Sequence, residues 1–219
     1  TGGSIRIPAS LCGIYGIKPS QGRVARLYSG PGGWGQLAQN GPMTRTVRDA
    51  AMLLQVMSGP DPADPTAIKE PPPDFSAALD GGVRGLRVGW SPAMGSLPVD
   101  KEVRRVTAQS VQLFEELGAD VEEAELGIDL QLVRDIFNTL FLSDFAANYG
   151  ELLASRAQDM SPFLLEMLVG AVQWPASKLA STLRELEWHR ARMDAVMGRY
   201  DLLLTPTLAT PAFLIGQRP

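Results

Sequence analysis

A strand–helix–strand pattern in residues 86–124 constrains the fold more than any other part of the sequence. Residues 86–90 and residues 120–124 are short segments typical of strands. Residues 101–117 between them carry apolar side chains at helical spacing: Val103, Val106, Val111, Leu113 and Phe114. Gly118 predicts the end of this helix. Two strands joined by a helix pair in parallel through a right-handed crossover, so the sequence predicts an α/β fold.

The rest of the chain predicts further helices and one long loop. Thr46 predicts the N-cap of a helix over residues 47–57, which Ser58-Gly59-Pro60 ends. Three more helices are predicted at residues 130–153, 162–172 and 175–199. Residues 60–85 are rich in proline, aspartate and glycine, which is typical of a surface connection. We interpret them as a long loop over one domain, because the strand that follows needs a sheet to join.

Charge and hydropathy exclude two classes of partner. The 219 residues carry a net charge of −4 and contain no run of lysine or arginine. Nucleic-acid binding needs a clustered basic surface, so we expect no nucleic-acid partner. No apolar stretch approaches the roughly 20 residues that span a bilayer, so we expect no membrane partner either.

Cys12 is the only cysteine of the chain. No internal disulfide can form, no Cys/His metal cluster is predicted, and we expect neither a metal nor another cofactor. This cysteine usage fits the reducing cytoplasm, where we expect the protein. Cys12 lies in the apolar run of residues 7–16, where a free cysteine packs as a small buried hydrophobe, so we do not expect it to be a nucleophile.

The first four residues, Thr1-Gly2-Gly3-Ser4, are the candidate functional segment. Two successive glycines allow backbone conformations closed to other residues, so consecutive N–H groups can converge beside the serine hydroxyl. Convergent donors beside a nucleophile form an oxyanion hole, in which one donor is worth about 10² to 10³ in rate. The segment predicts acyl transfer, but Gly-Gly-Ser also occurs in turns, linkers and phosphate-binding loops.

Two longer stretches resemble the amidase signature family of serine hydrolases. They are TGGSIRIPASLCGIYGIKPSQGRV, which starts at Thr1, and GPMTRTVRDAAMLLQVMSGPDPADP, which starts at Gly41. Residues 200–207, YDLLLTPT, are similar to a strand and turn of the family, whereas the middle of the chain matches loosely. The resemblance implies an α/β fold with a mixed sheet covered by helices. It also implies that residues 1–219 are a single incomplete domain, truncated at both ends.

The same resemblance assigns roles to the first residues. Ser4 would be the catalytic nucleophile. The oxyanion donors would be the backbone N–H groups of Thr1, Gly2, Gly3 and Ser4. Arg6 would be structural, paired with an aspartate one position before Thr1. The family uses a Ser–Ser–Lys triad, in which a lysine takes the nucleophile's proton through a bridging serine on a cis peptide bond. Both partners would precede Thr1.

No residue of the chain is an obvious substitute for that base. A serine hydroxyl needs an adjacent proton acceptor to attack at neutral pH. His189, the only histidine, lies in the charged amphipathic stretch 184–192, which predicts a solvated helix face. Lys18 would have to lose a proton from a pKa of about 10.4, and the resemblance places it in the scaffold. We expect the intact protein to hydrolyse a small-molecule carboxylic amide through acyl-Ser4, and the isolated chain to be inactive.

Two alternatives remain open. One is the A subunit of a tRNA-dependent amidotransferase, which shares the signature. Such subunits carry Ser-Leu-Asp-Gln before Gly-Pro, however, where this chain has GQLAQNGP at residues 35–42. The other is a family member without catalysis that only binds a partner.

Overall fold

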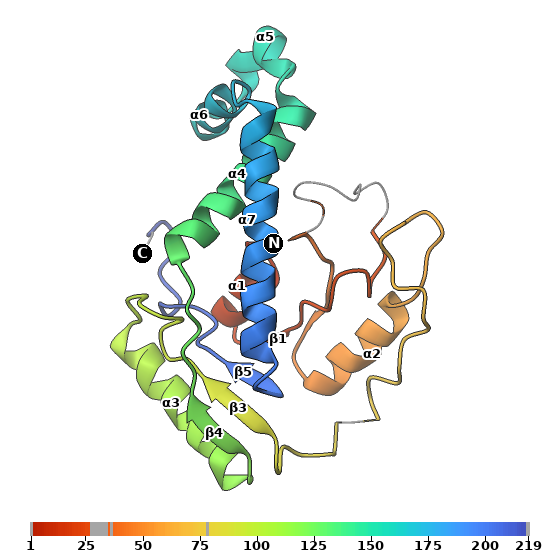
Figure 1. Ribbon diagram of the computed structural model, residues 1–219, viewed down its shortest axis with the longest axis vertical. Helices are drawn as coiled ribbons and strands as arrows, with labels where there is room; N and C mark the ends of the chain where they lie inside the picture. The colour runs from red at the N-terminus through yellow and green to blue at the C-terminus, as the bar shows by residue number, and fades with distance from the viewer. Residues whose placement is uncertain (1, 27–34, 36, 78, 218–219) are drawn as a thin grey trace. The chain divides into compact units, whose positions relative to one another are not determined.

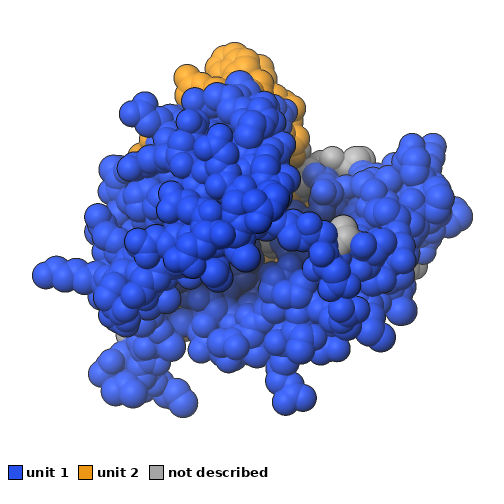
Figure 2. Space-filling model, turned by 90° about the horizontal axis from the view of Figure 1, so that it is seen from below, with its two compact units in different colours: residues 1–29, 39–128, 193–219 blue, residues 30–38, 129–192 orange. Residues whose placement is uncertain are grey.

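The computed structural model describes residues 2–26, 35, 37–77 and 79–217 (Figure 1). The chain divides into two compact units, shown in different colours in Figure 2. The first unit comprises Thr1–Ser29, Gln39–Ile128 and Met193–Pro219, and the second comprises Gly30–Ala38 and Asp129–Arg192. That residues 1–219 form a single incomplete domain stays a prediction.

A three-stranded parallel sheet forms the centre of the first unit. Its elements are β3 (Arg87–Trp90), α3 (Lys101–Glu116), β4 (Asp120–Glu123) and β5 (Leu202–Leu204). The strand order is β4-β3-β5, and Val88 of β3 pairs with Val121 on one side and Leu202 on the other. Val88 is fully buried because it lies on the central strand. The α/β fold and the parallel crossover through α3 are confirmed.

Side chains at the start of β5 fix this strand to the sheet. The Asp201 carboxylate accepts hydrogen bonds from the backbone N–H of Arg87 at 2.8 Å and from its guanidinium at 3.0 Å and 3.2 Å. The Tyr200 hydroxyl donates to Glu122 of β4 at 2.7 Å, and this hydrogen bond raises the pKa of Tyr200. The Tyr200 ring is buried against Ala124 and Leu126. Both polar and apolar contacts therefore hold β5 to strands that are distant in the sequence.

The N-terminal part of the first unit combines two helices with an antiparallel pair of strands. These elements are α1 (Arg6–Leu11), β1 (Tyr15–Gly16), β2 (Met43–Thr44) and α2 (Val47–Met57). The predicted N-cap is confirmed, since the Thr46 hydroxyl accepts from the backbone N–H of Asp49 at 3.1 Å. The helix α1 was not predicted from the sequence. Pro8 is compatible with it because the first turn of a helix needs no backbone N–H for an internal hydrogen bond.

The prediction that Cys12 is buried is wrong. Cys12 is exposed, and it forms the C-cap of α1. Because the helix ends there and Gly13 turns the chain with a φ of +64°, Cys12 lies in a surface turn rather than in the core.

The described residues of the predicted connection, 60–77 and 79–85, are irregular, and one buried carboxylate organises its first half. Asp64 is 8% exposed. One of its oxygens accepts from the backbone N–H of Arg26 at 2.8 Å, and the other accepts from the Thr66 hydroxyl at 2.7 Å and the Thr66 N–H at 2.8 Å. The Arg26 N–H and then the Thr66 hydroxyl lower the pKa of Asp64. Asp64 thus links this loop to residue 26.

Replacing Asp64 by asparagine is expected to lower the free energy of unfolding by about 1–3 kcal/mol, because the amide nitrogen cannot accept from the Arg26 N–H. The folded-state pKa is depressed, so the stabilisation is complete above the ordinary aspartate pKa and is lost as the pH falls through the lower folded value. The difference between wild type and Asp64→Asn should therefore be largest at neutral pH and shrink below about pH 4. Urea unfolding at several pH values measures this difference in the free energy of unfolding.

Asp61→Asn is the control. Asp61 is half-buried, and among the described residues its side chain accepts one N–H, from Ala63, which an asparagine oxygen can also accept. Equal stability of the two variants at neutral pH would contradict this role of Asp64.

The second unit is helical in the described residues. Its helices are α4 (Leu130–Tyr149), α5 (Leu152–Arg156), a 3-10 turn (Ala157–Asp159), α6 (Pro162–Ala171) and most of α7 (Ala176–Met197). The first predicted helix was too long, because α4 ends before Gly150. The break at residues 174–175 is confirmed. Leu140 and Leu168 are fully buried. Four aromatic rings contact one another in sequence along α4, the first pair stacked and the next two tilted, namely Phe137, Phe141, Phe145 and Tyr149. Within the described ranges, no helix combines the length and apolarity needed to cross a membrane.

Candidate functional site

Ser4 lies in a tight turn that leads into α1. Gly3 has a φ of +109°, a conformation that side-chain-bearing residues rarely adopt. Its carbonyl accepts from the Ile7 N–H at 2.7 Å, and a Cβ added to Gly3 would lie 2.8 Å from the Ile7 side chain. Gly3 is buried while Ser4 is exposed. The second glycine of the Gly-Gly pair is therefore required by the turn that presents the serine.

The turn leaves main-chain donors free next to this hydroxyl. In the described part of the chain, the N–H groups of Gly2, Gly3 and Ser4 donate to no protein acceptor. The Ser4 hydroxyl likewise has no hydrogen-bond partner among these residues. Unpaired N–H groups at successive residues are the donors that an oxyanion hole needs. Thr1, the remaining predicted donor, lies outside the described residues.

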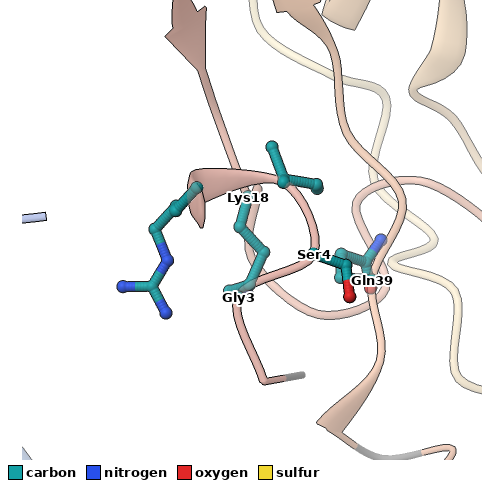
Figure 3. A pocket seen from close by; sticks show the side chains of 6 residues that line it. Gly3, Ser4, Lys18 and Gln39 are labelled. Carbon is teal, nitrogen blue, oxygen red and sulfur yellow. The ribbon is translucent and has the colours of Figure 1, made fainter. Parts of the chain in front are cut away.

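A small pocket adjoins Ser4, as Figure 3 shows. Its lining residues are Gly3, Ser4, Ile5, Arg6, Lys18 and Gln39. Three segments meet there: the turn before α1, the segment after β1, and the segment before β2. The pocket beside the Ser4 turn is therefore lined in part by residues that are distant from Ser4 in the sequence.

Lys18 enters the pocket from the segment after β1. Its Nζ donates to the Pro19 carbonyl at 2.6 Å. Partial burial, and secondly the charge of Arg6, lower the pKa of Lys18. In this geometry Nζ donates to a main-chain carbonyl. Among the described residues no hydrogen bond joins Lys18 to the Ser4 hydroxyl, so the structure does not place Lys18 as the proton acceptor of Ser4.

Gln39 is the buried polar residue of the pocket, with 8% of its surface exposed. Its side-chain nitrogen donates to the Val24 carbonyl at 2.8 Å, and its side-chain oxygen accepts from the Gly22 N–H at 3.4 Å. Both ends of the amide are thus used to hold residues 22–24. Gln39 therefore lines the pocket beside Ser4 with its own amide held in place (Figure 3).

A family model described as Amidase matches residues 1–219. The chain belongs to the amidase family. It is 34% identical to an acylamidase of Rhodococcus erythropolis over 220 residues, which are 98% of this chain and 45% of the relative. It is 45% identical to the A subunit of the glutamyl-tRNA(Gln) amidotransferase of Pseudomonas savastanoi pv. phaseolicola over 248 residues, which cover all of this chain and 50% of the relative.

Solved amidase structures show the same fold. A bacterial aryl acylamidase of the amidase signature family superposes with a TM-score of 0.85 at 32% identity, over 96% of this chain and 45% of the other. The 6-aminohexanoate cyclic dimer hydrolase, in complex with its substrate, superposes with a TM-score of 0.83 at 28% identity, over 98% of this chain and 47% of the other. The chain spans about half the length of the relatives it matches.

Two pocket residues of this amidase chain were missed by sequence reasoning. Lys18 was assigned to the scaffold, and Gln39 appeared only in the comparison of residues 35–42 with amidotransferase subunits. Neither carries a local signal, because each reaches the pocket only through the packing of its segment against the turn of Ser4.

Arg6 and His189 were also weighed from the sequence, one as a structural residue and one as a substitute base. Arg6 is exposed and lines the pocket, and no described carboxylate forms an ion pair with it, so its predicted ion pair stays a prediction. His189 lies on α7 in the second unit, half-buried beside Trp188 and Arg192. No group of three His, Cys, Asp or Glu residues that could hold a metal occurs among residues 2–26, 35, 37–77 and 79–217.

Proposed function

We propose that the protein is a serine amidohydrolase that cleaves a carboxylic amide through an acyl-enzyme on Ser4. The observation that carries this proposal is the turn at Gly3-Ser4 in a chain of the amidase family. It exposes a hydroxyl next to main-chain N–H groups that have no acceptor among the described residues. Relatives named acylamidase and amidase support amide hydrolysis as the reaction class.

The proposed reaction has two halves. The Ser4 oxygen attacks the carbonyl carbon, and the N–H groups of Thr1, Gly2, Gly3 and Ser4 stabilise the oxyanion. The C–N bond then breaks, and the nitrogen leaves as an amine or ammonia after taking up the proton that Ser4 lost. Water attacks the acyl-Ser4 ester, which releases the carboxylic acid and returns a proton to Ser4. The proton acceptor is the lysine that the resemblance implies, acting through the bridging serine.

Arg6 has a positioning role in this proposal. It follows the nucleophile by two residues and begins α1, so an ion pair with the implied aspartate would hold the Ser4 turn in place. The proposal uses no metal or other cofactor, and the substrate is a small-molecule amide. We place the protein in the cytoplasm because its single cysteine needs no oxidising compartment.

The A subunit of a tRNA-dependent amidotransferase is the second candidate. The 45% identity to the relative from Pseudomonas savastanoi favours it. The segment before Gly41-Pro42 speaks against it, because Ala38 stands where those subunits carry aspartate. An amidase turns over a simple aryl or aliphatic amide by itself, whereas turnover that depends on glutamyl-tRNA(Gln) would assign the protein to the second class and give it a nucleic-acid partner.

Capture by a fluorophosphonate probe tests the proposal. The probe phosphonylates only an activated serine: an O–P bond forms and fluoride leaves. We expect capture at Ser4, located by peptide mapping, in a longer form of the protein that carries the implied lysine and serine. We expect none in the 219-residue chain, where the Ser4 hydroxyl has no acceptor among the described residues.

Two results would contradict this proposal. No capture in a folded longer form would favour a partner-binding protein without catalysis. Equal capture by the 219-residue chain would show that the base is not missing from it. Ser4→Ala provides the background in both samples.

A further inference from the structure

A groove of the second unit lies between α4 and α7, which run side by side in Figure 1. Ile136 and Leu140 of α4 pack in one cluster with Leu186 of α7 and join the two helices. Next to this contact the helices enclose a hollow of about 480 Å³, which we call the α4–α7 groove. Its volume lies in the range of small-molecule sites. The groove shares no lining residue with the pocket of Ser4.

Two threonines of the α4–α7 groove are buried without hydrogen-bond partners. Thr139 of α4 and Thr182 of α7 line the groove, and each is 5% exposed. Among the described residues, neither hydroxyl donates or accepts a hydrogen bond. Neither hydroxyl is sealed off, because the one wholly occluded side-chain polar atom without a partner in that part of the chain is Ser58 Oγ. The surface that each threonine hydroxyl retains therefore opens into the groove.

Two carboxylates lie at one end of the groove. Asp135 and Glu185 line it, and they are the direct neighbours of Ile136 and Leu186, which pack in one cluster. Thr139 follows Asp135 by four residues, so its hydroxyl lies one helical turn from that carboxylate. Thr182 likewise precedes Glu185 by three residues. The unpaired hydroxyls and the carboxylates therefore share one side of each helix.

These carboxylates are available to a ligand. No ion pair joins Asp135 or Glu185 to a basic side chain in the described ranges. One oxygen of Asp135 accepts from the Gln131 amide at 2.9 Å, which leaves its other oxygen open. Glu185 also borders His189 and Arg192 in a neighbouring hollow, but it is paired with neither. A desolvated carboxylate is stabilised by a cation, and this end of the groove supplies two.

The ammonium group of Lys178 is held at the other end of the groove. Its Nζ lies 3.3 Å from the centre of the Trp174 ring, where the aromatic face attracts a cation. Lys178 precedes Glu185 by seven residues, which is about 10 Å along a helix. Leu142 of α4 adds an apolar side chain to the lining, two turns from Asp135. The groove thus has oxygen atoms at one end and apolar groups toward the other.

We propose that the α4–α7 groove binds a small organic cation, namely a primary ammonium group on a short hydrocarbon chain. The carboxylates of Asp135 and Glu185 would bind the positive charge. An ammonium group has three donors, and the hydroxyls of Thr139 and Thr182 would accept from them. The hydrocarbon chain would lie toward Leu142. This inference rests on the second unit by itself and is independent of the proposed acyl-enzyme.

Calorimetric titration with hexylammonium chloride tests the proposal. The samples are the 219-residue chain and the longer form of the protein used for fluorophosphonate capture. We expect saturable binding to both, with a Kd of about 1 mM or lower. Hexanol carries the same chain without the charge, and ammonium chloride carries the charge without the chain. Each should bind at least about 10-fold more weakly than hexylammonium.

Glu185→Gln removes the charge of one carboxylate and keeps an acceptor oxygen. It is expected to weaken hexylammonium binding by about 10-fold or more. Glu187→Gln is the matched control, because Glu187 lies on the same helix, pairs with Arg190 at 2.6 Å and does not line the groove. The Kd of this control should stay within about twofold of wild type. Equal losses in both variants would contradict a role of Glu185 in the groove.

Thr139→Val combined with Thr182→Val separates a ligand site from a structural one. Valine has nearly the same shape without the hydroxyl, so loss of two unpaired buried groups should raise the Tm by about 2 °C or more. Hexylammonium binding should fall by about 10-fold in the same variant. Thr107→Val is the control and should not raise the Tm, because the Thr107 hydroxyl donates to the Val103 carbonyl at 2.8 Å. A lowered Tm or unchanged binding in the valine pair would show that the hydroxyls are structural.

Further results would overturn the proposal. One is the absence of saturable hexylammonium binding in a folded sample. Equal affinity for hexanol would show an apolar surface only, and equal affinity for ammonium chloride would show an inorganic cation site. Binding to the 219-residue chain but not to the longer form would show that the groove is filled in the longer protein. Fluorophosphonate capture at Ser4, measured in the same samples, tests the proposed function separately.

Discussion

Replacing Ser4 by alanine is expected to lower kcat for amide hydrolysis by about 10⁴-fold or more, which is the scale of loss when a hydrolase loses its nucleophile. The Gly3 turn and the main-chain donors do not depend on the side chain of residue 4, so substrate binding should change little. The measurement is steady-state turnover of an aryl amide by the active form of the protein, together with binding of an unreactive amide. A fall in kcat without a large change in affinity would identify Ser4 as the nucleophile, because only the covalent step needs its hydroxyl.

Ser10→Ala is the matched control. Ser10 is an exposed serine at the far end of α1, and its hydroxyl makes no hydrogen bond among the described residues. Ser10→Ala also removes a serine hydroxyl, but from the other end of α1, and it should leave kcat within about twofold. If Ser4→Ala retained kcat, the acyl-enzyme mechanism would have to be abandoned. Similar losses in both variants would show that the damage is to folding and not to catalysis.

Replacing Gly41 by alanine is expected to destabilise the first unit by about 2–3 kcal/mol. A Cβ at this position would overlap the carbonyl oxygen of Ile17 and lie 2.8 Å from the Pro19 ring. The Ile17 N–H donates to the Pro42 carbonyl at 3.1 Å, so the two segments cannot move apart without loss of this bond. Since Lys18 lies between the two contacted residues, the substitution should also shift the wall of the Ser4 pocket. Urea unfolding measures the first effect, and the rate of fluorophosphonate capture in the active form measures the second.

Gly198→Ala is the control for this substitution. Gly198 belongs to the same unit, and the nearest atom to a Cβ there would be the Asp194 carbonyl oxygen at 3.4 Å, which is an ordinary contact. Its free energy of unfolding should stay within about 0.5 kcal/mol of wild type. A Gly41→Ala variant as stable as Gly198→Ala would show that the segment at Ile17 can move freely.

Elements with a strong local pattern were predicted well from the sequence. The helix at residues 47–57 has its bounds, its Thr46 cap and its end at Ser58 as predicted. The crossover through residues 101–116 also follows from local signals, since the apolar spacing, Gly118 and the flanking strands leave one topology. In both cases the information lies within a few residues, where backbone preference and side-chain spacing act directly.

Predictions that depended on packing were less successful. Cys12 was placed in the core because its neighbours are apolar, but a helix end and a glycine turn bring it to the surface. The short helix α1 was missed, since six residues give too little periodicity to recognise. Lys18 and Gln39 were not placed in the pocket, because the contacts that bring them there join segments 14 to 35 residues away from Ser4.

The sequence by itself determined the family, the helix α2, the crossover through α3 and Ser4 as the candidate nucleophile, because these depend on residues that are adjacent along the chain. Only the tertiary structure decided that Gly3 adopts a positive φ and that a lysine and a buried glutamine line the adjoining pocket. It also decided that the N–H groups of Gly2, Gly3 and Ser4 have no acceptor among the described residues. The physical reason is that hydrogen-bond pairing and burial are properties of segments brought together in space, and local sequence patterns do not specify which distant segment will supply the partner.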